Sequence, residues 1–205
     1  MPPDAGNLIH NIMKILTAIL ILTASLCCAQ TTILVQPFDS LGNAISNFDD
    51  PILQAKLDDA ISLLIPLINS NEFEKSFCKI RCLRKHGKTN CQIVDMIRNG
   101  NECSDLSCGI IRLNVAFDLM PGKKTSRVDK NKVIHVSSRY VYNNGVEVLS
   151  AELLKEYCKV LGFKNSPLQA RLRVYTVPYR VEKIVIMQLH KQQADKIATA
   201  TIVNE

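Results

Sequence analysis

Apolar residues recur at steps of three and four over residues 51–67, which is the spacing of one face of a helix. The stripe consists of Leu53, Leu57, Ala60 or Ile61, Leu64 and Leu67. Asp50 suits the N-cap of this helix and Pro51 its first position. Pro66 is expected to kink or end the helix near its last turn. A stripe of this kind usually packs into a core, and a lipid-binding or partner-binding face is the alternative.

Two shorter helices are predicted to follow. The first covers 72–86, with Asn71 as its cap and Gly87 as its stop. Its apolar face consists of Phe73, Phe77, Ile80 and Leu83. The second begins with Asn90 as its cap. Residues 50–109 are therefore predicted to form a small helical module.

The periodicity changes after Gly109, where apolar and polar residues begin to alternate as they do in strands. The predicted strands cover 110–120, 132–142, 170–181 and 182–189. One helix is predicted among them, over 150–163. The predicted fold class is α+β: a small disulfide-stapled helical module followed by a strand-rich half with one helix.

The first residues, 1–29, are predicted to be a signal peptide. Lys14 precedes a short apolar run, and small residues lead to a cleavage site after Ala29. The run is shorter than the roughly 20 residues of a membrane span, although an uncleaved anchor and a start at Met13 are alternatives. No later run is long and apolar enough to span a bilayer, so no span is expected after signal removal. The predicted organisation is 1–29 signal peptide, 30–49 extended leader, 50–109 cysteine-rich helical module and 110–205 mixed strand and helix domain.

Export to a secreted, extracellular location accounts for the cysteines. Two of the eight, Cys27 and Cys28, belong to the predicted signal. The other six are Cys78, Cys82, Cys91, Cys103, Cys108 and Cys158. An even number in an oxidising compartment suits a framework of three disulfides. Six cysteines allow many pairings, and their spacing does not choose among them.

A zinc site is the alternative use of the cysteine cluster. Cys78, Cys82, His86 and Cys91 have a spacing that a Cys3His site could use. The spacing differs from that of short zinc-binding pairs, and an oxidising compartment disfavours reduced thiols. No metal and no cofactor are therefore expected.

Recognisable catalytic motifs are absent from the sequence. It contains no G-x-S-x-G, H-E-x-x-H, P-loop or G-x-G-x-x-G pattern. Asp58 and Asp59 are adjacent, so on a helix their side chains diverge and do not face one substrate. His135 and His190 lie in predicted strands without a neighbouring nucleophile. The expected function is binding rather than catalysis, and a secreted enzyme with an unrecognised site is the alternative.

Basic residues gather in three places along a chain of net charge +6. The first set is Lys79, Arg81, Arg84, Lys85 and Lys88, which we take as the candidate anion-binding site. The second set is Lys123, Lys124, Arg127, Lys130 and Lys132. In the third, Arg171, Arg173 and Arg180 alternate with Tyr175 and Tyr179, a pattern that can suit single-stranded nucleic acid. An exported protein seldom meets nucleic acid, so the expected partner is an extracellular protein or a sulfated glycan; an ordinary solvated surface is the alternative.

Residues 158–163, CKVLGF, resemble the C-[RK]-x-L-G-[FY] signature of scavenger receptor cysteine-rich domains. In that family a strand with paired acids follows, and residues 184–190 stand at a similar offset here. Met187 and Gln188 occupy the places of the acids, so the family's cation-dependent ligand site is not carried over. Its disulfide pattern is broken as well, since two cysteines are missing. The resemblance covers 110–200 and implies an extracellular binding domain.

We expect protein recovered from the medium of expressing cells to begin at Gln30, because the apolar run ends in small residues just before it. N-terminal sequencing and intact mass test this expectation. Full-length protein retained in the cytosol would contradict both export and the disulfide framework.

Overall fold

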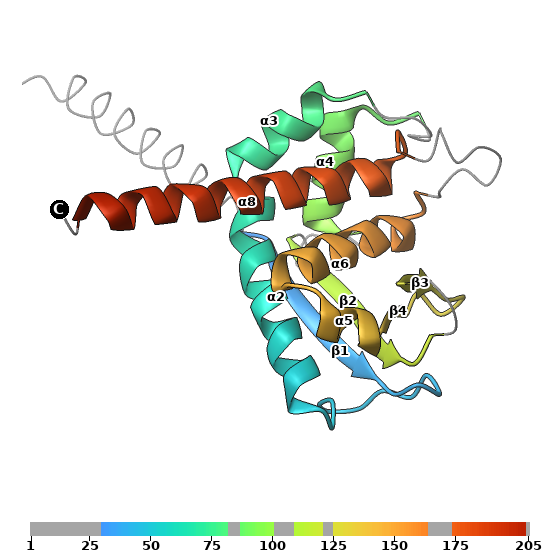
Figure 1. Ribbon diagram of the computed structural model, residues 1–205. Helices are drawn as coiled ribbons and strands as arrows, with labels where there is room; N and C mark the ends of the chain where they lie inside the picture. The colour runs from blue at the N-terminus through green and yellow to red at the C-terminus, as the bar shows by residue number, and fades with distance from the viewer. Residues whose placement is uncertain (1–29, 82–86, 101–108, 121–124, 164–173, 204–205) are drawn as a thin grey trace, which may run out of the picture. The chain divides into compact units, whose positions relative to one another are not determined.

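Four strands form one mixed sheet in the order β1-β2-β4-β3 (Figure 1). The structure is a computed structural model that describes residues 30–81, 87–100, 109–120, 125–163 and 174–203. The strands are β1 (Thr32–Phe38), β2 (Ile110–Asp118), β3 (Ser126–Val128) and β4 (Ile134–Ser137). β1, β2 and β4 are parallel, and β3 is antiparallel to β4. With six helices among the described residues, the fold class is α+β, as predicted.

The predicted extended leader contains an edge strand of this sheet. Thr32 to Phe38 pair in register with Ile110 to Ala116 of β2. Two neighbouring parallel strands need a long crossover between them, and residues 39–109 supply it. The leader is therefore corrected to a structural part of the sheet, since Ile33 is buried against the core.

Helix α2 (Pro51–Asn69) begins the crossover, and its predicted start is confirmed. The Asp50 carboxylate accepts hydrogen bonds from the backbone N–H groups of Ile52 and Leu53, at 2.9 and 3.2 Å. The helix continues through Pro66 to Asn69. Leu53, Leu57, Ala60, Leu64 and Leu67 of the predicted stripe are buried and Ile61 is partly buried, so this face of α2 belongs to the core.

Helices α3 (Asn71–Lys79) and α4 (Asn90–Asn99) complete the crossover. Each is capped one residue earlier than predicted, by the side chains of Ser70 and Thr89. α3 also ends at Lys79 rather than in the predicted stretch 80–86, because Ile80 adopts an extended conformation and closes the helix. Arg81 therefore lies beyond the end of α3.

Helices α5 (Ser138–Asn143) and α6 (Val146–Val160) follow β4 directly. The strand predicted over 132–142 is thus shorter than expected, and its second half is helical. α6 packs against α2, β3, β4 and α8 (Val177–Val203), so every residue from Leu149 to Cys158 is buried. α6 is the central helix of the structure.

The two strands predicted over 170–181 and 182–189 are wrong. From Val177 on, this stretch lies in α8, a single helix of 27 residues, and the described residues 174–176 form a turn before it. Its buried residues are Val177, Val181, Ile184, Val185 and Leu189. Their steps of three and four follow the helical period, which here prevailed over the strand preference of β-branched residues.

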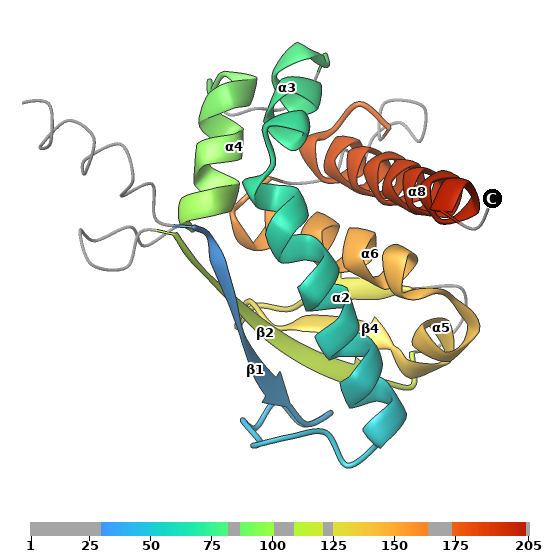
Figure 2. The same ribbon diagram turned by 90° about the vertical axis from the view of Figure 1, so that its left-hand side faces the viewer.

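The helices α2, α5 and α6 lie on one side of the sheet (Figure 2). Residues of α2, α3, α4, α6 and α8 share one hydrophobic core with this face, and the core crosses the predicted boundary at residue 109. On the opposite face, Leu34, Gln36 and Arg112 are exposed, and no helix among the described residues covers them. None of the described helices is long and apolar enough to cross a membrane.

A disulfide between Cys78 and Cys91 joins α3 to α4. Changing both cysteines to serine should lower the free energy of unfolding by about 3 kcal/mol, because closing a loop of this length removes that much entropy from the unfolded chain. Urea denaturation of the double variant and the wild type measures the difference. If the two proteins unfold at the same urea concentration and with the same dependence of unfolding free energy on urea, the prediction is contradicted.

Candidate functional site

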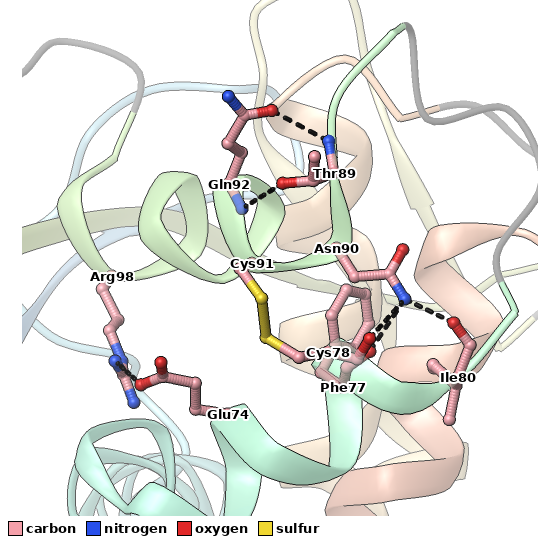
Figure 3. Close-up of a disulfide and its surroundings, with 9 residues drawn as sticks. All are labelled: Glu74, Phe77, Cys78, Ile80, Thr89, Asn90, Cys91, Gln92 and Arg98. Atoms are coloured by element: carbon pink, nitrogen blue, oxygen red, sulfur yellow. Dashed lines mark hydrogen bonds and ion pairs between the residues drawn. A yellow bond between two sulfur atoms is a disulfide. The ribbon is translucent and has the colours of Figure 1, made fainter.

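The disulfide-closed segment, which we define as residues 79–90, lies between α3 and α4 (Figure 3). Cys78 and Cys91, which bound it, are separated by 13 positions, and their Cα atoms are 5.1 Å apart. The segment is therefore a closed ring of chain whose two ends are fixed next to each other. This pair confirms that a disulfide forms within the predicted cysteine cluster.

Hydrogen bonds hold both ends of this ring. The buried side-chain amide of Asn90 donates to the carbonyl oxygens of Phe77, at 2.9 Å, and of Ile80 (Figure 3). Thr89 and Gln92 form a reciprocal capping box at the start of α4. The carbonyl groups left over at the end of α3 and the N–H groups at the start of α4 thus find partners.

Arg98 ties the other ends of the two helices together. Its guanidinium forms an ion pair with Glu74 of α3 at 2.7 Å (Figure 3). It also donates to the carbonyl oxygens of Ile68 at 2.9 Å and Ser70 at 3.1 Å. Because Arg98 lies one helix length from the disulfide, α3 and α4 are fixed to each other at two places.

Three of the predicted anion-binding residues lie at this ring. Lys79, Arg81 and Lys88 are all exposed, and none of them forms an ion pair with another described residue. Arg84 and Lys85 lie outside the described residues. The structure corrects the reason for their grouping: the cations do not share the outer face of a helix over 72–86, and the disulfide brings the ends of their segment together.

The second basic set lies on β3 and the turn after it. Arg127, Lys130 and Lys132 are exposed, and Arg127 has a guanidinium nitrogen 3.7 Å from an oxygen of Asp118. Lys123 and Lys124 lie outside the described residues. This set is therefore partly neutralised, in contrast to Lys79, Arg81 and Lys88.

The other predicted disulfide partners remain predictions. Cys82, Cys103 and Cys108 lie outside the described residues, and Cys158 is buried in the core on α6. Cys78 and Cys91 are bonded to each other, so they do not serve as the predicted zinc ligands. Within the described ranges, no three His, Cys, Asp or Glu side chains are grouped to hold a metal ion.

A buried ionic cluster, which the sequence did not reveal, connects α6 to α8. The Lys155 ammonium lies 2.5 Å from Glu152 and 3.1 Å from Glu182. Burial alone would lower the pKa of Lys155, but the two carboxylates outweigh it and raise the pKa to about 12. Burial also raises the pKa of the Glu182 carboxyl, an effect that Lys155 opposes.

The same cluster reaches β3 at the edge of the sheet. The Ser126 hydroxyl contacts Glu152 and lies 2.7 Å from a carboxylate oxygen of Glu156. Glu156 is completely buried and pairs with Lys159. Together these contacts join β3, α6 and α8 through charged and polar groups inside the protein.

His135 lies between two carboxylates. Its Nδ1 is 2.6 Å from an oxygen of Asp118, and its Nε2 is 3.2 Å from one of Asp129. Burial opposes a low pKa for Asp129, yet hydrogen bonds from the Val133 N–H and His135 lower it. Because both ring nitrogens are occupied, His135 acts here as a link between β2, β4 and the turn, and it offers no unoccupied nitrogen to a substrate.

Two residues of the third basic set, Tyr179 and Arg180, lie on α8, and Tyr175 lies just before it. The Arg180 guanidinium lies over the Tyr175 ring, 4.7 Å from its centre. Lys155 of α6 lies 5.5 Å from the centre of the Tyr179 ring. Arg171 and Arg173 are outside the described residues.

Comparisons of the chain with family models, with curated proteins and with solved structures find no match. Residues 184–190, which the scavenger receptor resemblance would place in a strand, lie within α8. The candidate site is therefore defined by its own residues: a cationic ring closed by a disulfide on two fixed helices.

Lys155→Met should destabilise the protein by about 3–5 kcal/mol, because it leaves the buried carboxylate of Glu152 without its cation. Adding Glu152→Gln removes that uncompensated charge, so the double variant should recover much of the loss. Urea denaturation of the three proteins measures both effects. A double variant no more stable than the single one would assign the loss to packing instead of charge.

Proposed function

We propose that the protein is exported and acts by binding an anionic glycan, with the disulfide-closed segment as its binding site. One observation carries the proposal: a disulfide closes a ring of chain that contains five Lys and Arg residues and no Asp or Glu. These five are Lys79, Arg81, Arg84, Lys85 and Lys88. The ring thus has a uniformly positive charge.

The closure supports binding of a polyanion for a physical reason. Cations on an open loop lose conformational entropy when a ligand holds them together, and that loss subtracts from the affinity. The bond between Cys78 and Cys91 limits this freedom before the ligand arrives. Sulfate groups on a glycan can then contact several cations at a lower entropic cost.

Exposure of the cations supports the same function. Lys79, Arg81 and Lys88 are in contact with solvent and have no acidic partner among the described residues, so a ligand anion does not have to displace one. Exposed charges of this kind interact over about 8 Å at physiological ionic strength and less as salt rises. Binding should accordingly weaken with salt.

The export part of the proposal is supported by two features. The residue pattern over 1–29 is that of a signal peptide. The disulfide between Cys78 and Cys91 is of a kind that persists in oxidising compartments and is rare in reducing ones. A secreted protein meets sulfated glycans at cell surfaces and in the matrix around cells.

Changing Lys79, Arg81 and Lys88 to glutamine should lower the salt needed for elution from heparin far more than it does on a sulfonate exchanger. The matched control changes Arg112, Arg127 and Lys130 to glutamine, which removes the same charge from exposed positions elsewhere. We expect the control to shift both columns equally. Equal shifts for both triple variants on heparin would mean that net charge alone decides retention, and the proposed site would be wrong.

The double variant Cys78→Ser, Cys91→Ser tests how much the disulfide itself, apart from the charge of the ring, contributes to heparin binding. It keeps every cation but opens the ring, so heparin retention should fall while elution from the sulfonate exchanger stays unchanged. The comparison is made at a temperature where circular dichroism shows the variant folded. Unchanged heparin retention would show that closure has no part in binding.

A further inference from the structure

A groove of about 640 Å³ lies along α8, within the range of about 300–1,000 Å³ that is typical of small-molecule sites. Most of its lining is apolar: Val174, Tyr175, Tyr179, Ile186 and Met187. Met187 is exposed, whereas Ile186 packs against the core and Tyr179 contacts Lys155 of α6. The groove therefore lies beside the contact between α8 and α6.

The apolar lining is unusually accessible to water. Val174, Tyr175 and Met187 are 53%, 40% and 55% exposed. Three large apolar side chains gathered at one groove form a patch, and a patch of this kind marks a binding surface more often than a lone exposed residue does. An apolar ligand would remove this surface from water.

Arg180 supplies the polar end of the groove. Its guanidinium is held over the ring of Tyr175, and its Nε is buried without a hydrogen-bond partner among the described residues. A buried donor without an acceptor is unfavourable, and it gains most from an acceptor that carries charge. A ligand carboxylate beside the guanidinium can accept from its terminal nitrogens.

The other charges at the groove favour an anion as well. Lys183 lines it and is exposed. The Glu182 carboxylate, the acidic side chain in the lining, is paired with Lys155 at 3.1 Å. Two cations and one neutralised acid leave this end of the groove positive.

We propose that this groove binds a carboxylic acid with an extended apolar tail. The tail lies over Tyr179, Ile186 and Met187, and the carboxylate meets Arg180, with Lys183 close by. This site is separate from the cationic ring and does not depend on the glycan proposal. It also differs from the lipid-binding face considered for the stripe of α2, which is buried.

Calorimetric titration with dodecanoic acid, dodecanol and dodecylamine, each kept below its aggregation concentration, tests the proposal on the intact protein. The three probes share one tail and differ in charge. The acid should bind about tenfold more tightly than the alcohol, and the amine should bind most weakly. Equal affinity for acid and alcohol, or no binding of either, would overturn the proposal.

Single-residue variants of the groove identify the side chains that bind the carboxylate and the apolar tail. Arg180→Gln should weaken the acid about tenfold and leave the alcohol unchanged. Met187→Gln, which makes the lining polar without adding charge, should weaken acid and alcohol alike. Lys191→Gln, an exposed change on the same helix outside the groove, is the matched control and should alter nothing.

Two further outcomes are decisive. Where Arg180→Gln does not fold, Lys183→Gln takes its place and should weaken the acid selectively. An acidic peptide that binds the protein without being displaced by dodecanoic acid, while Met187→Gln abolishes its binding, would assign the groove to a protein partner and overturn the proposal.

Discussion

Burial of the middle of α6, from Leu149 to Cys158, is the constraint on which the rest of the structure depends. This stretch carries the buried charged residues Glu152, Lys155 and Glu156, and a buried charge without a partner costs several kcal/mol. Neighbouring elements must therefore bring polar groups to it. β3 provides Ser126, and α8 provides Glu182. A wrong arrangement of the sheet edge or of α8 would leave charges buried alone, so the cluster favours a single assembly of these elements.

The cationic ring lies outside this constraint. It is held by the disulfide, by Asn90 and by the ion pair between Arg98 and Glu74, none of which involves α6. The groove on α8 is connected to it, because Glu182 both lines the groove and pairs with Lys155 of α6. Surface residues of the ring can therefore change without altering the packing that holds the sheet, α6 and α8 together.

The sequence predicted those elements whose local signals agree with each other. For α2, a cap at Asp50 and an apolar stripe of helical period point to the same helix, and β2 alternates from Ile111 to Val115. α8 was misjudged because Val, Ile and Tyr at alternate positions suggest strands, although the buried residues keep a helical period. The leader was predicted as extended chain, but its place in the sheet was missed, because nothing in the sequence of β1 indicates its partner strand β2.

The candidate sites were predictable to different degrees. The basic residues of the ring are visible in sequence, but their closure rests on a cysteine pairing that spacing does not determine. The ionic cluster was missed because Glu and Lys are normally assigned to the surface, and only the packing of α6 shows them inside. His135 is flanked by Asp118 and Asp129, which are 17 and 6 positions away, so strand pairing and a turn were needed to bring the three together.

The disulfide also decides what happens if the ring is cut. Its exposed Lys79, Arg81 and Lys88 are the residues after which trypsin-like proteases cleave, and such enzymes are common outside cells. Hydrolysis after Arg81 or Lys88 would break the backbone, yet Cys78 and Cys91 would still join α3 to α4. β1 and α2 would stay attached to β2 and the rest of the sheet. The nicked protein would remain one molecule, and two separate pieces would form only after reduction as well as hydrolysis.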